Sequence, residues 1–189
     1  AKLFFGTNGD GADGVAFVLQ NQSINAGSSG GGLGYQGINP SFSVEFDTFF
    51  NAEGDPGTGA DHISIIKNGN AGTITAHSEF ATPYYVELED GQWHNARFVW
   101  NAATKNFQFW YENVKRNDIT IDLKADVFNN ANYVYWGFTA ATGGSMNLQQ
   151  VEVQEYCTVR QVDLSLKPGT NNGSSATTFC QGADVELEA

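Results

Sequence analysis

The sequence SFSVEFDTFFNAEGDPGTGADH, residues 41–62, begins with a strict alternation of side-chain character. Val44 and Phe46 fall on one face of an extended strand. Glu45 and Asp47 fall on the opposite face, where their carboxylates lie close together. A period of two residues is typical of a half-buried β-strand, so the pattern predicts a strand over residues 41–49.

Similar patterns recur along most of the chain. Further strands are predicted over residues 15–19, 62–67, 84–88, 93–100, 106–112, 119–123, 133–140 and 148–156. Only residues 123–128 resemble a helical turn, and glycine, at 22 of 189 residues, is frequent enough to supply many turns. Many strands joined by turns indicate an all-β fold, either a β-sandwich or a barrel.

Composition limits the classes of function. The chain has 9 Lys and Arg against 21 Asp and Glu, a net charge of -12, which excludes a basic nucleic-acid-binding protein. Hydrophobic residues make up 41% of the chain and aromatic residues 13%, enough for a folded core. No apolar run approaches the ~18 residues of a transmembrane helix, so no membrane span is expected.

The C-terminal part of the chain differs in character. We expect one domain over residues 1–160 and, over 161–189, a linker followed by the start of another module, because residues 167–175 are rich in Gly, Asn and Ser. Cys157 and Cys180 lie 23 positions apart without a zinc-ligand spacing. An acidic, Asn- and Gly-rich chain indicates export, where the two cysteines would form a disulfide; two unpaired thiols are the alternative.

Oxygen donors are concentrated after the strand at residues 41–49. The Glu45 and Asp47 carboxylates repel each other unless something compensates, and Asn51, Asp55 and Asp61 follow in the same loop. Several oxygens on a loop, together with a backbone carbonyl near Phe49, suit calcium. A set with an imidazole suits a transition metal such as manganese: Glu45, Asp47, Asp55 and His62. A solvated acidic loop that binds no metal is the alternative from these residues alone.

The spacing of these residues resembles the metal-binding motif of the L-type lectins, the legume-lectin family and its bacterial relatives. Six positions match that motif: Glu45, Asp47, Phe49, Asn51, Asp55 and His62. The resemblance implies a concanavalin-like jelly-roll β-sandwich of antiparallel sheets. It implies calcium held by Asp47, the Phe49 carbonyl, Asn51 and Asp55. It also implies a second ion, Mn²⁺ or another transition metal, held by Glu45, Asp47, Asp55 and His62.

Three further segments resemble the family's sugar-binding loops. They are GADGVAF at residues 11–17, GGGLG at 30–34 and WGFTAATG at 136–143. The resemblance implies a cis bond between Ala12 and Asp13, with hydrogen bonds from the Asp13 carboxylate to sugar hydroxyls. The saccharide-binding residues it implies are Asp13, Gly31, Phe49, Asn51, Gly144 and Ser145.

The resemblance covers residues 4–156. Members of the family usually have an N-terminal strand and further residues before this turn, whereas only 12 residues precede Asp13 here. We therefore expect that an N-terminal strand is missing and that the chain is a fragment. Residues 162–189 weakly resemble the start of an immunoglobulin-like module of bacterial surface proteins. The predicted function is calcium-dependent binding of a saccharide or glycan, without catalysis, in an exported or cell-surface protein.

Two other functions are alternatives to the lectin hypothesis. Laminarinase-like glycoside hydrolases share the jelly-roll fold and carry a Glu-x-Asp-x-x-Glu motif on a strand. In this chain Glu45 and Asp47 match its first half, but Phe50 stands at the position of the second Glu. A structural or adhesion module without sugar affinity is the other alternative. Of the remaining histidines, His77 is interpreted as a loop residue and His94 as a strand residue.

Overall fold

β-Strands form most of the regular structure in the computed structural model, which describes residues 1–57, 59 and 61–155. The strands are β1 (Lys2–Phe4), β2 (Gly14–Gln20), β3 (Ser41–Asp47), β4 (His62–Lys67), β5 (Tyr84–Tyr85), β6 (Trp93–Asn101), β7 (Asn106–Tyr111), β8 (Val114–Thr120), β9 (Tyr135–Ala141) and β10 (Gln150–Glu152). Three short helices accompany them: the 3₁₀ helices η1 (Gly30–Gly32) and η2 (Ile74–Ser78), and the π-helix η3 (Leu123–Val127).

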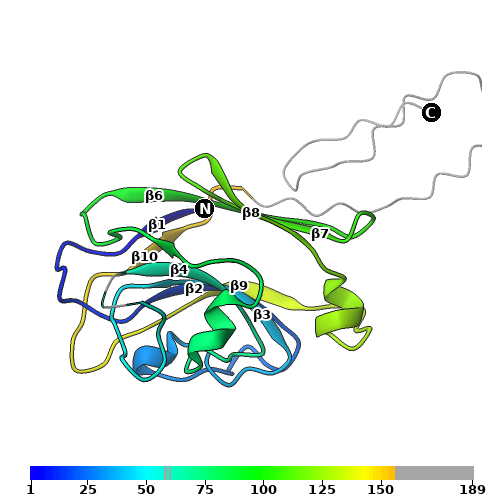
Figure 1. Cartoon of the computed structure of the whole chain (residues 1–189), viewed down its shortest axis with the longest axis horizontal. Helices are drawn as coiled ribbons and strands as arrows, with labels where there is room; N and C mark the ends of the chain where they lie inside the picture. The colour runs from blue at the N-terminus through cyan, green and yellow to red at the C-terminus, as the bar shows by residue number, and fades with distance from the viewer. Residues whose placement is uncertain (58, 60, 156–189) are drawn as a thin grey trace, which may run out of the picture. The chain divides into compact units, whose positions relative to one another are not determined.

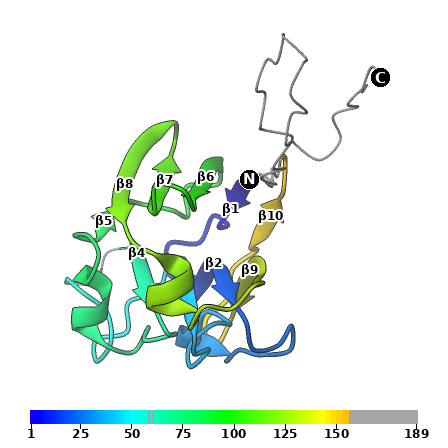
Figure 2. The same cartoon turned by 90° about the vertical axis from the view of Figure 1, so that its right-hand side faces the viewer.

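The strands form two sheets, each of five strands within the described residues. One sheet has the order β10-β1-β6-β7-β8 and the other β5-β4-β3-β2-β9. Every neighbouring pair is antiparallel. Figures 1 and 2 show the sheets as two layers, with the short helices near the second sheet. The predicted all-β sandwich of antiparallel sheets is therefore confirmed.

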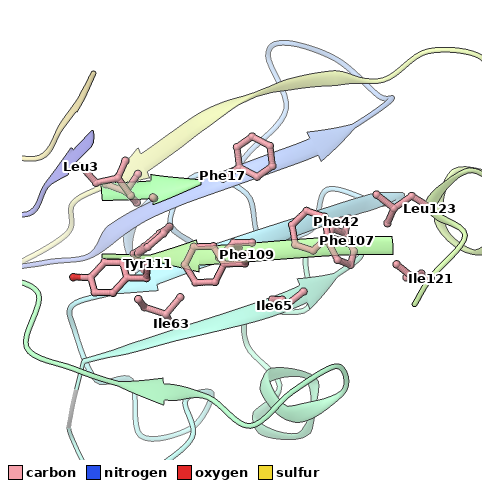
Figure 3. Packing of buried hydrophobic residues seen from close by; sticks show 14 of the residues in the cluster. Leu3, Phe17, Phe42, Ile63, Ile65, Phe107, Phe109, Tyr111, Ile121 and Leu123 are labelled. Atoms are coloured by element: carbon pink, nitrogen blue, oxygen red, sulfur yellow. The ribbon is translucent and has the colours of Figure 1, made fainter. Parts of the chain in front are cut away.

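The main core lies between the two sheets, and β3 shows how the sequence builds it. Phe42, Val44 and Phe46, at alternate positions of β3, are fully buried. Phe46 packs against Phe109 of β7, with ring centroids 5.7 Å apart, and Phe17 of β2 stacks on Phe98 of β6 at 4.1 Å. Figure 3 shows this layer of side chains between the ribbons. Burial of large aromatic side chains supplies most of the driving force for packing one sheet on the other.

The opposite face of β3 is covered as well, and this burial positions the functional residues. Leu33, Tyr35 and Ile38, from the long segment between β2 and β3, form a second apolar cluster with residues of β2, β4 and η2. With the core on one face and this cover on the other, every residue of β3 is buried, including Glu45 at 0% and Asp47 at 2% exposure. The polar face of the strand is therefore enclosed by loops instead of facing solvent.

The predicted strand over residues 119–123 is wrong, because the structure places β8 at Val114–Thr120. Glu112 and Asn113 have φ of 50° and 60°, the left-handed conformation of a tight hairpin turn between β7 and β8. Most residues of β8 are exposed or half-buried, so the strand lacks the apolar alternation that identified the others. The sequence prediction also did not include β1, and it extended β5 by three residues.

Residues Ala1–Glu152 form one compact unit, and a second unit begins at Val153. The predicted boundary at residue 160, the linker at 167–175 and both cysteines, Cys157 and Cys180, lie outside the described residues, so these expectations stay predictions. Among the described residues, no helix is long and apolar enough to cross a membrane.

Candidate functional site

The antiparallel pairing of β3 with β4 brings the predicted metal-binding residues together. Asp47 lies directly opposite His62 in the register of the two strands. Ligand atoms of Asp47, Asp55 and His62 all lie within 4.8 Å of one another, and all three residues are buried. These carboxylates are therefore not solvated, which contradicts that part of the acidic-loop alternative, while their binding of a metal stays a prediction.

Burial disfavours the ionised forms of the carboxylates in this cluster. Burial raises the pKa of Asp47 well above its ordinary value, and the charges of Glu45 and Asp55 raise it further. Burial also raises the pKa of Asp55, although a backbone N–H of Asn51 opposes the shift. A divalent cation among these oxygens would remove the repulsion, so the donor set fits calcium.

The loop after β3 is shaped by its own carboxylates. The Phe49 N–H donates to Asp47 Oδ1 at 2.8 Å, and the Asn51 N–H donates to Asp55 Oδ2. The N–H groups of Gly54 and Asp55 donate to the Asn51 carbonyl at 2.9 and 3.0 Å. These bonds hold Asn51 beside Asp55, as the predicted calcium set requires.

Asp61 lies apart from this cluster, although it belongs to the same loop in the sequence. Its Oδ2 accepts a hydrogen bond from the Leu88 N–H at 2.9 Å, and its carboxylate groups with those of Glu87 and Glu89. Burial raises the pKa of Asp61 to about 6. Among the oxygen donors of the loop, Asp61 is therefore the one that the fold directs elsewhere.

Glu45 lies deeper, in a cluster that the sequence did not reveal. Its Oε1 lies 3.0 Å from His77 Nε2 and 3.4 Å from His62 Nε2, and its Oε2 accepts a hydrogen bond from the Tyr35 hydroxyl. The interpretation of His77 as a plain loop residue is wrong, because η2 carries it into this buried cluster. Residue 77 lies outside the motif at residues 45–62, and no spacing rule connects the two.

Electrostatics hold Glu45 in its ionised form. Burial alone would raise its pKa, but hydrogen bonding and the charges of His62 and His77 lower the pKa to about 2. Burial would lower the pKa of His77, yet Glu45 raises it above its ordinary value. The cluster thus combines a carboxylate with two imidazoles, ligands that also suit a transition-metal ion.

Asp13 immediately precedes β2, and its backbone is hydrogen-bonded to the end of β9 and to the residue after β3. Its N–H donates to the Ala141 carbonyl at 3.0 Å, and its carbonyl accepts from the Thr48 N–H at 3.1 Å. The preceding bond, Ala12–Asp13, is cis, as the resemblance implied. Asp13 is 4% exposed, and its Oδ2 has no hydrogen-bond partner among the described residues. Burial raises the pKa of this carboxyl group.

Two glycines show how closely the predicted sugar-binding loops approach one another. A Cβ on Gly31 would lie 2.3 Å from Asn51 Oδ1, so a side chain at position 31 would displace Asn51. A Cβ on Gly143 would lie 3.4 Å from Asp13 Oδ2 and 3.6 Å from the Gly30 Cα. Four segments distant in sequence therefore approach one another here, and they carry Asp13, Gly30 and Gly31, Asn51, and Gly143.

A cavity of about 290 Å³ opens beside these loops. Phe49 and Ser145, two of the predicted sugar-binding residues, line it. Gly144 is exposed next to Ser145, with open space where a side chain would begin. The cavity is lined by Gly9, Asp10, Thr48, Phe49, Phe50, Gly59, Asp61 and Ser145. Asp13, Gly31 and Asn51 are not among the lining residues, and the role of each residue in sugar binding stays a prediction.

The arrangement does not resemble the carboxylate pair of a glycoside hydrolase. Glu45 is enclosed with two histidines, and Phe50 lines the cavity where the second Glu of a hydrolase motif would stand. Among the residues described, neither Glu45 nor Asp47 lines the cavity. Paired carboxylates facing a substrate, which retaining and inverting mechanisms require, are not formed by this strand.

Comparison with protein families agrees with the fold. The model described as the legume lectin beta-barrel domain matches residues 1–155. Agglutinin-2 of Cladrastis kentukea is 32% identical over 152 residues, which cover 73% of this chain and 49% of the agglutinin. The pesticidal crystal protein Cry22Aa of Bacillus thuringiensis is 29% identical over 184 residues, covering 82% of this chain and 26% of that protein.

A similar solved structure is the winged bean acidic lectin complexed with methyl-α-D-galactose. It is 28% identical, with a TM-score of 0.58, and the match covers 77% of this chain and 61% of that one. The chain spans about half or less of the length of both curated relatives described above.

Proposed function

The chain belongs to the L-type lectin domain family, and on this premise we propose that it binds a saccharide or glycan with the help of calcium, without catalysing a reaction. The proposed binding residues are Asp13, Gly31, Phe49, Asn51, Gly144 and Ser145. The winged bean acidic lectin, which binds a galactoside, supports the general class of ligand.

The Asp13 carboxylate is the observation that supports this proposal most directly. It is buried where three loops meet, and one of its oxygens has no hydrogen-bond partner among the described residues. A buried carboxylate oxygen without a donor is costly. Hydroxyl groups of a sugar would supply donors to this oxygen, and charge-assisted hydrogen bonds are stronger than neutral ones. Phe49 would offer an apolar ring to a sugar face, and Asn51 an amide donor.

The role of calcium follows from the loop that connects Asp47 to Asp55. Asp47, the Phe49 carbonyl, Asn51 and Asp55 would hold the ion, which supplies positive charge to offset the buried carboxylates. An ion held there would also fix the position of the loop that carries Phe49 and Asn51. We therefore expect sugar binding to be lost on chelation while the fold remains.

A glycan array with and without calcium tests the proposal, followed by titration of the best glycan. Asp13→Asn should abolish binding, since the amide replaces one acceptor with a donor. Asp118→Asn is the matched control, because Asp118 is an exposed residue of β8 in the other sheet. Binding that persists in excess EDTA would contradict the calcium role, and binding that persists in Asp13→Asn would contradict the site.

Location and catalysis need separate tests. The proposal places the domain in an exported or cell-surface protein, where shallow sites gain avidity from several copies. Fractionation of the native source would test that location. Release of reducing ends from a β-glucan would contradict the proposal that the chain is not an enzyme.

A further inference from the structure

Three carboxylates from two segments gather beside the start of β4, outside the clusters of Glu45 and Asp47. One carboxylate oxygen each from Asp61, Glu87 and Glu89 lie within 4.8 Å of one another. In the described part of the chain, none of these three residues forms an ion pair with a basic side chain. Like charges at such distances oppose each other's ionisation, so the group lacks a compensating positive charge.

The backbone and the core hold these carboxylates together. Asp61 Oδ2 accepts a hydrogen bond from the Leu88 N–H at 2.9 Å, and the Asp61 carbonyl accepts one from the Val86 N–H at 3.3 Å. Leu88 is fully buried in the main core, and Val86 packs against the same core. Glu87 and Glu89, which alternate with these two residues, are the ones that meet Asp61. The proximity of the three carboxylates therefore follows from the fold itself.

Glu89 gives a second, independent indication that a ligand belongs here. The residue is 4% exposed, and its Oε1 accepts a hydrogen bond from Asn147 Nδ2 at 2.7 Å. Its Oε2 is buried and has no hydrogen-bond partner among the described residues. A buried carboxylate oxygen with neither a donor nor a cation is costly, and such atoms are rare in folded proteins. A cation bound between the three carboxylates would compensate this oxygen.

We propose that Asp61, Glu87 and Glu89 bind one Ca²⁺ ion, separate from the calcium proposed for the loop after β3. Carboxylate oxygens without an imidazole or a thiolate suit hard cations such as Ca²⁺ and Mg²⁺. Calcium is favoured because it accepts an irregular set of carboxylates, each binding through one or two oxygens, whereas Mg²⁺ demands near-ideal octahedral geometry. Water molecules would complete the coordination of the ion.

The surroundings provide the outer-shell donors and the access that a metal site requires. The Leu88 N–H orients the Asp61 carboxylate, and the Asn147 amide orients that of Glu89. Asp61 also lines the cavity of about 290 Å³, and Glu87 is exposed, so an ion can reach the three carboxylates from solvent. Asn147 belongs to the loop after β9, so an ion that fixes Glu89 would restrain this loop as well.

Calorimetric titration of the metal-free full chain with Ca²⁺ tests this proposal. The unmodified chain should bind one Ca²⁺ more per chain than Glu89→Gln, which lacks the charge of the buried ligand. Glu87→Gln should weaken binding at the same site about tenfold or more, and it should keep the fold because Glu87 is exposed. Glu79→Gln is the matched control, since Glu79 pairs with Lys67 at 3.1 Å instead. It should bind calcium like the unmodified chain.

A variant of the loop after β3 separates the two calcium sites. Asp55→Asn should lose the calcium proposed for that loop but keep the ion at Asp61, Glu87 and Glu89. Equal numbers and affinities of Ca²⁺ in the unmodified chain, Glu87→Gln and Glu89→Gln would overturn the proposal. Loss of all calcium in folded Asp55→Asn would overturn it too, as would Mg²⁺ binding here as tightly as Ca²⁺. None of these measurements uses a sugar, so their failure would leave the proposed saccharide binding to its own test.

Discussion

Replacing Asp47 by Asn should change the stability of the domain in opposite directions with and without calcium. In the metal-free protein the Asp47 pKa is raised by burial and by Glu45 and Asp55, so its ionised form opposes folding at pH 7. Asn keeps the acceptor for the Phe49 N–H but removes the charge. Metal-free Asp47→Asn should therefore melt no lower than the metal-free parent chain, and its advantage should shrink as the pH falls.

Calcium should reverse that order, because Asp47→Asn loses a ligand. Calcium at 100 times its Kd stabilises the form that binds it by about 2.7 kcal/mol. For a unit of the size of Ala1–Glu152, 1 kcal/mol shifts Tm by ~2–4 °C, so the parent chain should gain about 5–11 °C. Asp47→Asn should gain almost nothing from this site.

Differential scanning calorimetry at pH 7, in EDTA and then in excess calcium, measures both effects. Asp118→Asn is the control, since Asp118 lies on β8 and pairs with Lys115. It should keep the full calcium shift. The reasoning fails if calcium raises the Tm of Asp47→Asn as much as that of the parent, or if metal-free Asp47→Asn melts several degrees below the metal-free parent.

Three further substitutions test other parts of the structure. Burial and neighbouring carboxylates raise the pKa of Glu89 from 4.5 to about 7, so the folded state loses stability as the pH rises between these values. Glu89→Gln should therefore have a higher Tm than the parent chain at pH 8 in EDTA but the same Tm at pH 4. Parallel curves of Tm against pH for the two proteins would contradict this. Gly31→Ala should displace Asn51 and weaken sugar binding about tenfold or more in calorimetric titration, with little change in Tm. An unchanged affinity would show that the loops tolerate the extra methyl group. Phe46→Ala should lower the free energy of unfolding, measured by chemical denaturation, by ~3–5 kcal/mol, whereas Val114→Ala, on exposed β8, should lower it by less than ~0.5 kcal/mol. Similar losses for the two variants would show that Phe46 contributes little to the core.

The sequence predicts strands where burial on one face imposes a pattern. β4 was predicted with its observed bounds, His62–Lys67, and β3 within two residues, because both contribute alternate side chains to the core. β8 contributes little to the core, so its sequence, VKRNDIT, carries no such pattern. The strand is formed by its hairpin pairing with β7, a tertiary effect that local reasoning does not detect.

In the candidate site, too, the sequence predicts the residues that lie close together in the chain and misses those that come from distant segments. Residues of the segment 45–62 were predicted together, because a strand, a loop and the start of the next strand bring them into one region. Tyr35 and His77 were not, since each belongs to a different covering segment. Their relation to Glu45 depends on how those segments close over the outer face of the sheet, and a strand pattern shows only that the face is polar.

The segment between β2 and β3 contacts both the Glu45 cluster and the region proposed to bind sugar. Within five residues it places Gly31 against Asn51 and the Tyr35 hydroxyl on Glu45. The Leu33 carbonyl accepts a hydrogen bond from Thr139 of β9 at 2.9 Å, which ties the same segment to the strand that precedes Gly143. We therefore expect a change in the charge around Glu45 to affect the position of Gly31. Because one covering segment contacts both regions, removal of the proposed metal ions should disturb the loops proposed to bind sugar before it disturbs the core between the sheets.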